Sequence, residues 1–140
     1  MGRVEIDNFD PYRYYDNGYF TGKYEHSYTN YLGSKEILSQ EFAKTLQFVR
    51  KVGPAEGKLL EIGCAYGYFL ELIQKLYPRS VGGDVAAAAV ARACARGLDA
   101  RTGEILAMRF DDPFDAVCLW DPIEHLPQPF EVLGRAGELL

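Results

Sequence analysis

The 140-residue chain is 48% hydrophobic and 25% charged, which is the composition of one globular domain with a single core. Fifteen Lys and Arg against twenty Asp and Glu give a net charge of -5, which offers no attraction to a nucleic-acid backbone or an anionic bilayer. The longest apolar runs also fall far short of the roughly 20 residues that cross a membrane. We therefore expect neither a nucleic-acid partner nor a membrane partner.

The three cysteines indicate the compartment. Cys64, Cys94 and Cys118 are an odd number, and their spacing matches neither a disulfide framework nor the paired knuckles of a zinc site. The first residues lack the basic and then apolar block of a secretion signal. We expect a cytoplasmic location and no metal site.

Residues 1–33 differ from the rest because they hold most of the ten tyrosines, interleaved with glycines. They are predicted to form a tyrosine-rich cap on a domain of residues 34–140. Aromatic side chains at this density either line a binding cleft or pack as a lid on the domain, and the sequence leaves both open. His26, in the same segment, is expected to be a surface or lid residue.

A helix is predicted from Ser34, its candidate N-cap, to the stop at Gly53-Pro54. Its apolar face has helical spacing and consists of Leu38, Phe42, Thr45, Leu46 and Val49.

Strands and helices alternate after this helix. The predicted elements are a strand at 59–62, a glycine turn at 63–67, a helix from about 68 to 78, a strand at 80–84, a helix at 86–96, strands at 99–102 and 114–120, and a helix from 129. In the last helix, Phe130, Leu133 and Leu140 are expected to face inward. The alternation predicts an α/β fold, a Rossmann-like, doubly wound parallel sheet.

In such a sheet the ligand binds beyond the carboxyl ends of the strands, where the turn 63–67 lies. Ala65 and Tyr68 replace two glycines of the dinucleotide fingerprint, which leaves an NAD(P)-dependent oxidoreductase as a minor alternative. Glu61 beneath the turn would repel a pyrophosphate but suits a cationic ammonium or sulfonium group. Asp84, about 20 residues on, either accepts hydrogen bonds from a ribose diol or caps the following helix.

The segment Leu60-Glu61-Ile62-Gly63-Cys64-Ala65-Tyr66-Gly67 resembles the signature of the class I S-adenosylmethionine-dependent methyltransferases. Residues 114–127 resemble the fourth-strand motif of the small-molecule branch, which includes ubiquinone-pathway O-methyltransferases. The resemblance implies S-adenosylmethionine as cofactor and methyl transfer to an unidentified small-molecule acceptor. The expected cofactor-binding residues are Glu61, Gly63, Cys64, Ala65, Gly67, Asp84, Val85, Glu104, Ile105 and Trp120.

Some positions depart from the family pattern or carry a second interpretation. Ala65 replaces a more usual glycine, a mild change if its φ is negative, and Ala86 stands where Ser or Pro often caps the next helix.

His125 is the expected catalytic base, although His125 and Glu124 could instead be local turn and cap residues. Cys64 is expected to be a small turn residue rather than a nucleophile. The acceptor-side wall is expected from the tyrosine-rich cap and from the loop at 120–125.

The family has seven strands, and this sequence supplies four. We expect the C-terminal strands to be missing, so that the strand at 114–120 forms a bare edge through which the chain self-associates. A chain of this kind is expected to be weakly active or inactive. The alternative function is a non-catalytic domain of the same fold, used for partner binding.

Overall fold

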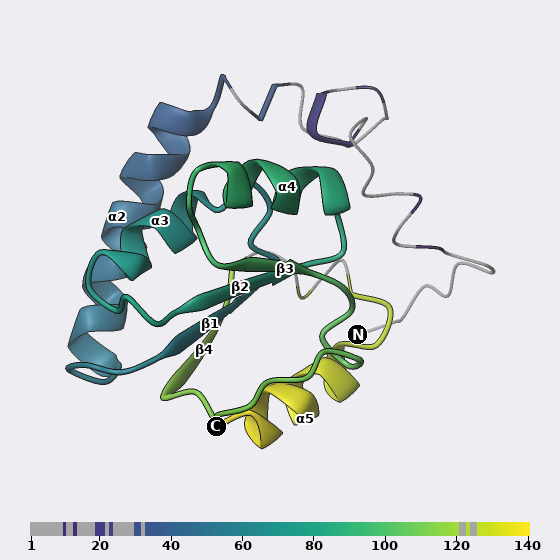
Figure 1. Ribbon diagram of the computed structural model, residues 1–140. Coiled ribbons are helices and arrows are strands. Elements are labelled where there is room, and N and C mark those ends of the chain that lie inside the picture. Colours follow the sequence, from purple (N-terminus) through teal and green to yellow (C-terminus); the bar gives the residue numbers. More distant parts are fainter. Residues whose placement is uncertain are drawn as a thin grey trace, which may run out of the picture.

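The structure is a computed structural model that describes residues 10, 13, 19–21, 23, 30, 31, 33–120, 123 and 126–140. A four-stranded sheet in the order β3-β2-β1-β4 forms its centre (Figure 1). The strands are β1 (Leu59–Ile62), β2 (Val81–Asp84), β3 (Ala100–Thr102) and β4 (Ala116–Leu119). The helices are η1 (Tyr19–Thr21), α2 (Lys35–Val52), α3 (Tyr68–Gln74), α4 (Ala87–Ala95) and α5 (Pro129–Glu138).

The order of the strands reverses at β1. The chain passes from β1 to β2 and then to β3 on one side, and β4 returns to the other side of β1. All three strand pairs are parallel, with Leu60 opposite both Val81 and Val117. The predicted α/β, doubly wound parallel sheet is thereby confirmed, and its switch point lies between β1 and β4, where sheets of this kind bind ligands.

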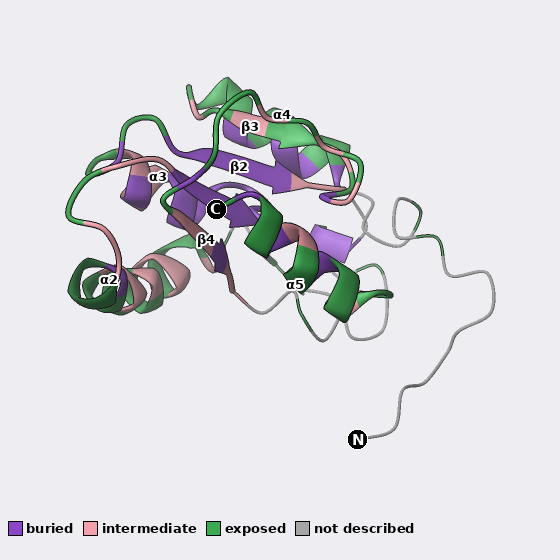
Figure 2. Ribbon diagram, turned by 90° about the horizontal axis from the view of Figure 1, so that it is seen from below, coloured by how far each residue is buried: buried purple, intermediate pink, exposed green. Residues whose placement is uncertain are grey.

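Helices cover both faces of the sheet, and β1 shows which helix lies on which face. Leu59 packs with Phe69 of α3 and with residues of α2, whereas Leu60 and Ile62 pack with Val132 of α5. Figure 2 shows the buried β2 in the middle and exposed outer surfaces on α2, α4 and α5. Because side chains alternate along a strand, the third residue of β1 points to the same face as Leu59, toward α3.

The buried stripe of α5 differs from the predicted one. Phe130, Leu133 and Leu140 were expected inside, but they are 84%, 44% and 62% exposed, so this prediction is wrong. The buried stripe consists of Val132, Ala136 and Leu139. Both stripes have helical spacing, and tertiary contact selects between them: the Leu139 carbonyl accepts a hydrogen bond of 2.8 Å from the Phe114 N–H at the approach to β4.

One helix cap and one strand boundary also differ from the predictions. Ser34 occupies the N-cap position of α2, but its hydroxyl donates to the Asn30 carbonyl at 3.0 Å and makes no capping hydrogen bond. The fourth strand is shorter than the predicted 114–120 and is only half-buried apart from Cys118, because β1 is its single neighbour within the described sheet.

The three cysteines are free, and Cys64 and Cys118 are buried. Burial raises the pKa of the Cys118 thiol to about 12. Among the described residues, no helix is both long and apolar enough to span a bilayer, and no group of three or more metal-ligating side chains is gathered.

Candidate active site

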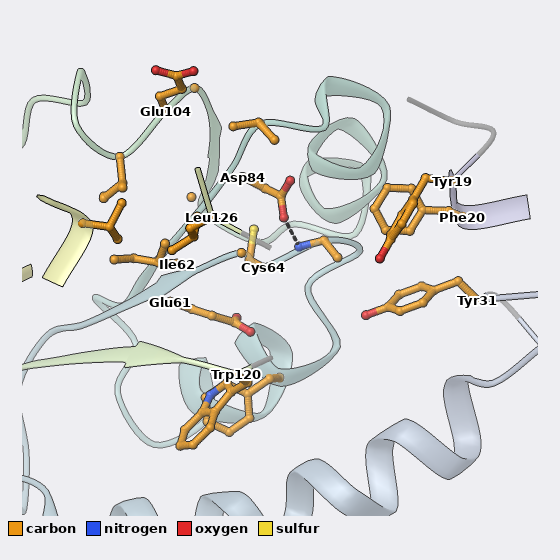
Figure 3. Close-up of a pocket in the computed structure, with 18 of the residues that line it drawn as sticks. Tyr19, Phe20, Tyr31, Glu61, Ile62, Cys64, Asp84, Glu104, Trp120 and Leu126 are labelled. Atoms are coloured by element: carbon orange, nitrogen blue, oxygen red, sulfur yellow. Dashed lines mark hydrogen bonds between the residues drawn. The ribbon is translucent and has the colours of Figure 1, made fainter. Parts of the chain in front are cut away.

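A cavity of about 510 Å³ lies at the carboxyl ends of the strands (Figure 3). Its volume falls within the range of roughly 300–1,000 Å³ that is typical of small-molecule sites. All of the expected cofactor-binding residues except Gly67 line it: Glu61, Gly63, Cys64, Ala65, Asp84, Val85, Glu104, Ile105 and Trp120. The structure thus brings together residues from the ends of four strands that are far apart in the sequence.

Hydrogen bonds tie the glycine turn to the end of β2. The N–H groups of Gly63 and Cys64 both donate to the Gly83 carbonyl, at 2.8 and 3.2 Å. Gly67 has a positive φ of 73° at the start of α3, where an added Cβ would lie 2.7 Å from Leu98 Cδ1. Gly67 therefore allows close packing behind the turn and does not reach the cavity.

Ala65 has a φ of 46°, which places it in the left-handed region. The expectation of a mild replacement required a negative φ, and that condition is not met. An L-residue pays about 1–2 kcal/mol for this conformation, because its Cβ crowds the following carbonyl. A hydrogen bond of 2.8 Å from the Ala65 N–H to Asp84 Oδ2 stabilises this strained conformation.

Asp84 is anchored by both of its carboxylate oxygens. Oδ2 accepts from the Ala65 N–H, the dashed line in Figure 3, and Oδ1 accepts from the Ala86 N–H at 2.8 Å. The second bond holds the start of α4, where Ala86 offers no side-chain cap. Burial raises the pKa of Asp84, and these backbone donors oppose the shift. Asp84 therefore caps the start of α4, as the capping interpretation predicts, and it also lines the cavity.

Glu61 is only 3% exposed. The Leu70 N–H at the start of α3 donates to its carboxylate, but Oε2 is buried without a hydrogen-bond partner among the described residues. Burial, and then repulsion by Asp84, raise the pKa of Glu61 well above its ordinary value. A buried carboxylate oxygen without a donor is costly, so this oxygen is suited to a cationic or hydrogen-bonding group of a ligand.

Cys64 is held in an environment that disfavours a thiolate. Burial, followed by the neighbouring carboxylates of Glu61 and Asp84, raises its pKa well above the ordinary range. A thiol in this state is a poor nucleophile, as expected for a small turn residue.

Gly82 was not singled out from the sequence, yet it shapes the site. A Cβ at this position would lie 2.7 Å from Leu70 Cδ2 and 2.8 Å from Cys64 Sγ. Glycine therefore lets the turn lie directly against β2. The signal in the sequence was a glycine pair, Gly82-Gly83, inside a strand pattern, which often marks close approach of another segment.

Described residues of the tyrosine-rich segment pack against the residues that follow the glycine turn. Tyr31 stacks on Tyr68 with ring centroids 5.3 Å apart and meets Tyr66 edge-on at 5.0 Å, while Phe20 lies 5.0 Å from Tyr66. Phe20 and Tyr31 also line the cavity, as does Tyr19. These three residues therefore line the cavity and also pack against the domain, so the two interpretations of the segment do not exclude each other here.

Helix α2 contributes a wall that sequence reasoning assigned to the core. Leu38, Glu41, Phe42 and Thr45 line the cavity. Their spacing of three and four residues puts them on one face of the helix, and it was the same spacing that predicted a core-facing stripe. A stripe next to a cavity and a stripe in a core have the same pattern, so the sequence could not separate them.

The expected catalytic base, His125, lies outside the described residues, as do Glu124 and His26. Trp120, which precedes this stretch, is described and lines the cavity; its ring meets Phe69 edge-on, with centroids 5.2 Å apart.

Comparisons with known structures show the same fold. DesVI from Streptomyces venezuelae superposes with a TM-score of 0.65 at 21% identity, covering 79% of this chain and 49% of that one. The N-methyltransferase NodS from Bradyrhizobium japonicum WM9, in complex with S-adenosyl-L-homocysteine, gives 0.63 at 24% identity, with 72% and 55% covered. A SAM-dependent methyltransferase from Thermotoga maritima gives 0.59 at 25% identity, with 74% and 49% covered. A comparison with curated proteins gives no significant match.

The chain spans about half the length of these solved structures. A family described as "Methyltransferase domain" matches residues 34–140, which is most of the chain. The finer resemblance to ubiquinone-pathway O-methyltransferases stays a prediction. The glycine turn, the acids near the ends of β1 and β2, and this match lead to one conclusion: the chain belongs to the methyltransferase-domain family and has the fold of the class I S-adenosylmethionine-dependent methyltransferases.

Proposed function

We propose that this chain binds S-adenosylmethionine and holds it for methyl transfer to a small-molecule acceptor. The observation that carries the proposal is Glu61 Oε2, a buried oxygen without a partner among the described residues, in a residue that lines the cavity beside the glycine turn. S-Adenosylmethionine carries an ammonium group and a sulfonium group, and either cation would compensate a buried carboxylate.

The residues that line the cavity fit the other parts of this cofactor. Gly63 and Cys64 form the turn that would cradle the methionine portion. Asp84 keeps carboxylate lone pairs for the hydroxyls of a ribose, and Glu104 with the Ile105 N–H, at the other end of the cavity, would lie by the adenine (Figure 3). Bound in this way, the cofactor supplies a methyl group activated by its sulfonium.

The protein's own contribution would be positioning and exclusion of water. Aromatic side chains of the N-terminal segment, α2 and α3 wall the cavity and would hold an acceptor in line with the methyl group. An acceptor that must lose a proton needs a base, and His125 remains our candidate for that role.

Calorimetric titration with S-adenosylhomocysteine tests the proposal. We expect micromolar binding, strongly weakened in Asp84→Ala and in Glu61→Gln. Asp99→Asn removes an exposed acid that does not line the cavity, and should bind like the wild type. Absence of binding to the folded protein would refute the proposal. Binding of a nicotinamide cofactor in its place would favour the oxidoreductase alternative.

A non-catalytic domain with this fold is the second candidate, and the unpartnered Glu61 oxygen speaks against it because a vestigial site has no use for a buried charge. Binding of S-adenosylhomocysteine together with turnover of any acceptor would exclude it. An activity screen with phenols, sugars, carboxylates and amines supplies that second measurement.

Three further features belong to this proposal. Residues 1–33 would act as a cap on the domain of residues 34–140, supported by the packing of Phe20 and Tyr31 on Tyr66. The free cysteines are consistent with the cytoplasm. The exposed edge of β4 would pair with a second chain.

A further inference from the structure

The part of the cavity next to α2 and the N-terminal segment has aromatic walls, one of which is Trp120, a residue also expected to contact the cofactor. Phe42 of α2 lies 5.5 Å from Phe69 of α3, which in turn lies 5.2 Å from Trp120, measured between ring centroids. Tyr19, Phe20 and Tyr31 stand at one side of this region (Figure 3). We call the region lined by these six aromatic residues the aromatic compartment.

The charge around the cavity has one sign. Among the described residues that line it, four are acids and none is Lys, Arg or His. Glu61, Asp84 and Glu104 are the acids that the proposed function assigns to the cofactor. The fourth, Glu41, stands on α2 one residue before Phe42, at the edge of the aromatic compartment.

Two buried polar atoms in the walls of the cavity have no partner among the described residues. They are Oε2 of Glu61, a residue only 3% exposed, and the indole N–H of Trp120. Tyr66, Tyr68 and Arg135 also have a buried polar atom without a described partner outside the cavity, but only Glu61 leaves a carboxylate oxygen unpaired, which is the costlier case. A bound molecule with a donor and an acceptor would complete both cavity atoms.

We infer that the aromatic compartment takes a small amine carried on an apolar body, as the methyl acceptor of this site; the inference rests on the proposed function. An ammonium group is attracted by the acidic lining and by the negative faces of aromatic rings. A carboxylate or phosphate acceptor would meet four acids, of which only Glu41 is paired with a described cation, Lys44. The negative charge of the lining therefore favours the binding of amines over that of anionic acceptors.

In methyl transfer to an amine, the bond that forms is matched by the bond that breaks. The amine first releases a proton to water and becomes neutral, its nitrogen lone pair forms the new N–C bond, and the C–S bond breaks with its electron pair returning to sulfur. The products are a methylated ammonium and the neutral thioether S-adenosylhomocysteine. No oxidant or metal is needed.

Glu41 would act at the entrance rather than at the reacting atoms. Its carboxylate is largely exposed and is paired with Lys44 at 2.8 Å. Exposed charges contribute little to affinity, so loss of the Glu41 charge should weaken the binding of an amine by only about two- to five-fold. The deeper discrimination would come from the aromatic walls and the buried acids.

Trp120 is the only tryptophan in the chain and lies in the compartment, so its fluorescence reports binding there directly. The protein is first saturated with S-adenosylhomocysteine and then titrated with three probes of similar size: phenethylamine, 2-phenylethanol and phenylacetate. We expect the amine to bind at least ten-fold more tightly than the alcohol, and phenylacetate to bind most weakly. The preference for the amine should shrink as salt is raised.

Glu41→Gln supplies the variant and Glu36→Gln its matched control, because Glu36 is an exposed acid on the same helix that does not line the cavity. Glu41→Gln should lower the affinity for the amine two- to five-fold and leave the alcohol unchanged, whereas Glu36→Gln should change neither. Both variants keep Trp120 as the reporter.

Three results would overturn the inference: equal binding of amine and alcohol, tighter binding of phenylacetate, or no fluorescence response to any probe. Calorimetric titration with S-adenosylhomocysteine is a separate measurement on the same sample. If that titration succeeds while the probes fail, the acceptor class is wrong and the proposed function stands. If the titration with S-adenosylhomocysteine fails, the proposed function itself is refuted, whatever the probes do.

Discussion

Glu61 shows how one residue can favour binding at the expense of stability. Its carboxylate is buried near Asp84, and the Leu70 N–H is its backbone hydrogen-bond donor. Burial and the like charge of Asp84 raise its pKa well above the ordinary value of 4.5. The ligand-free protein is therefore destabilised wherever the folded state must ionise this group.

The pH dependence follows from the direction of that shift. Below pH 4.5 Glu61 is protonated in both the folded and the unfolded chain, and it costs no stability. As the pH rises from there through the raised pKa of the folded state, the unfolded chain ionises first and stability falls. Glu61→Gln should remove this loss, so that the variant is more stable than the wild type at pH 7 and the difference shrinks toward pH 4.

Urea unfolding of both proteins at several pH values measures this. The Gln amide oxygen can still accept from the Leu70 N–H, so the comparison isolates the charge. Glu104→Gln, at an exposed acid of the same cavity, is the control and should leave stability unchanged. A destabilised Glu61→Gln at neutral pH would show that the folded protein already satisfies the carboxylate.

Ala65 offers a second prediction at this scale. Because its φ is 46°, Ala65→Gly should relieve about 1–2 kcal/mol of strain and lose up to about 1 kcal/mol through the freer unfolded chain. We expect a small net stabilisation. Ala88→Gly, at an exposed position inside α4, should instead destabilise by about 1 kcal/mol. Equal losses in the two variants would mean that Ala65 carries no strain.

The element with the most room for stabilisation is α5. A Cβ at Gly134 or Gly137 would meet no atom within 4 Å, and both positions lie inside the helix. Gly134→Ala should therefore stabilise the protein by about 0.5–1 kcal/mol. Denaturant unfolding gives the free energy, and an unchanged or lower value would indicate that α5 is frayed in solution.

Gly82→Ala tests the opposite case, because β2 has no room for an added side-chain atom at this position. The added Cβ would lie 2.8 Å from Cys64 Sγ, so β2 and the glycine turn must separate. Overpacking of this kind costs about 1–3 kcal/mol, and the affinity for S-adenosylhomocysteine should fall as well. Gly83→Ala, whose Cβ would meet the flexible Met108 side chain at 3.1 Å, is the control and should cost less.

For the whole molecule, we expect the edge of β4 and the outer face of α5 to mediate self-association. The residues of β4 other than Cys118 are only half-buried, and Phe130, Leu133 and Leu140 leave an apolar stripe on α5. We expect a dimer or larger assembly at micromolar concentration, measured by sedimentation. Val117→Lys, which places a charge on the edge strand, should shift the distribution toward monomer. A monomeric wild type would refute self-association.

Local patterns in the amino-acid sequence suffice to predict the order of the elements and the position of the site. Leu59–Ile62 is a short apolar run ended by Gly63, and this local pattern suffices to predict a buried strand and a turn. Because parallel strands end at one edge, the acids near the carboxyl ends of β1 and β2, Glu61 and Asp84, had to meet there. Nine of the ten expected cofactor-binding residues line the cavity for that reason, with Gly67 the exception.

Features that depend on contacts between distant segments could not be predicted from local patterns. Val132 is buried and Phe130 exposed because the sheet and the Phe114 hydrogen bond fix the rotation of α5, whereas both are equally apolar in the sequence. Likewise, the left-handed conformation of Ala65 depends on a hydrogen bond to Asp84, 19 residues away. Helical periodicity says which residues share a face, but only packing says what that face meets.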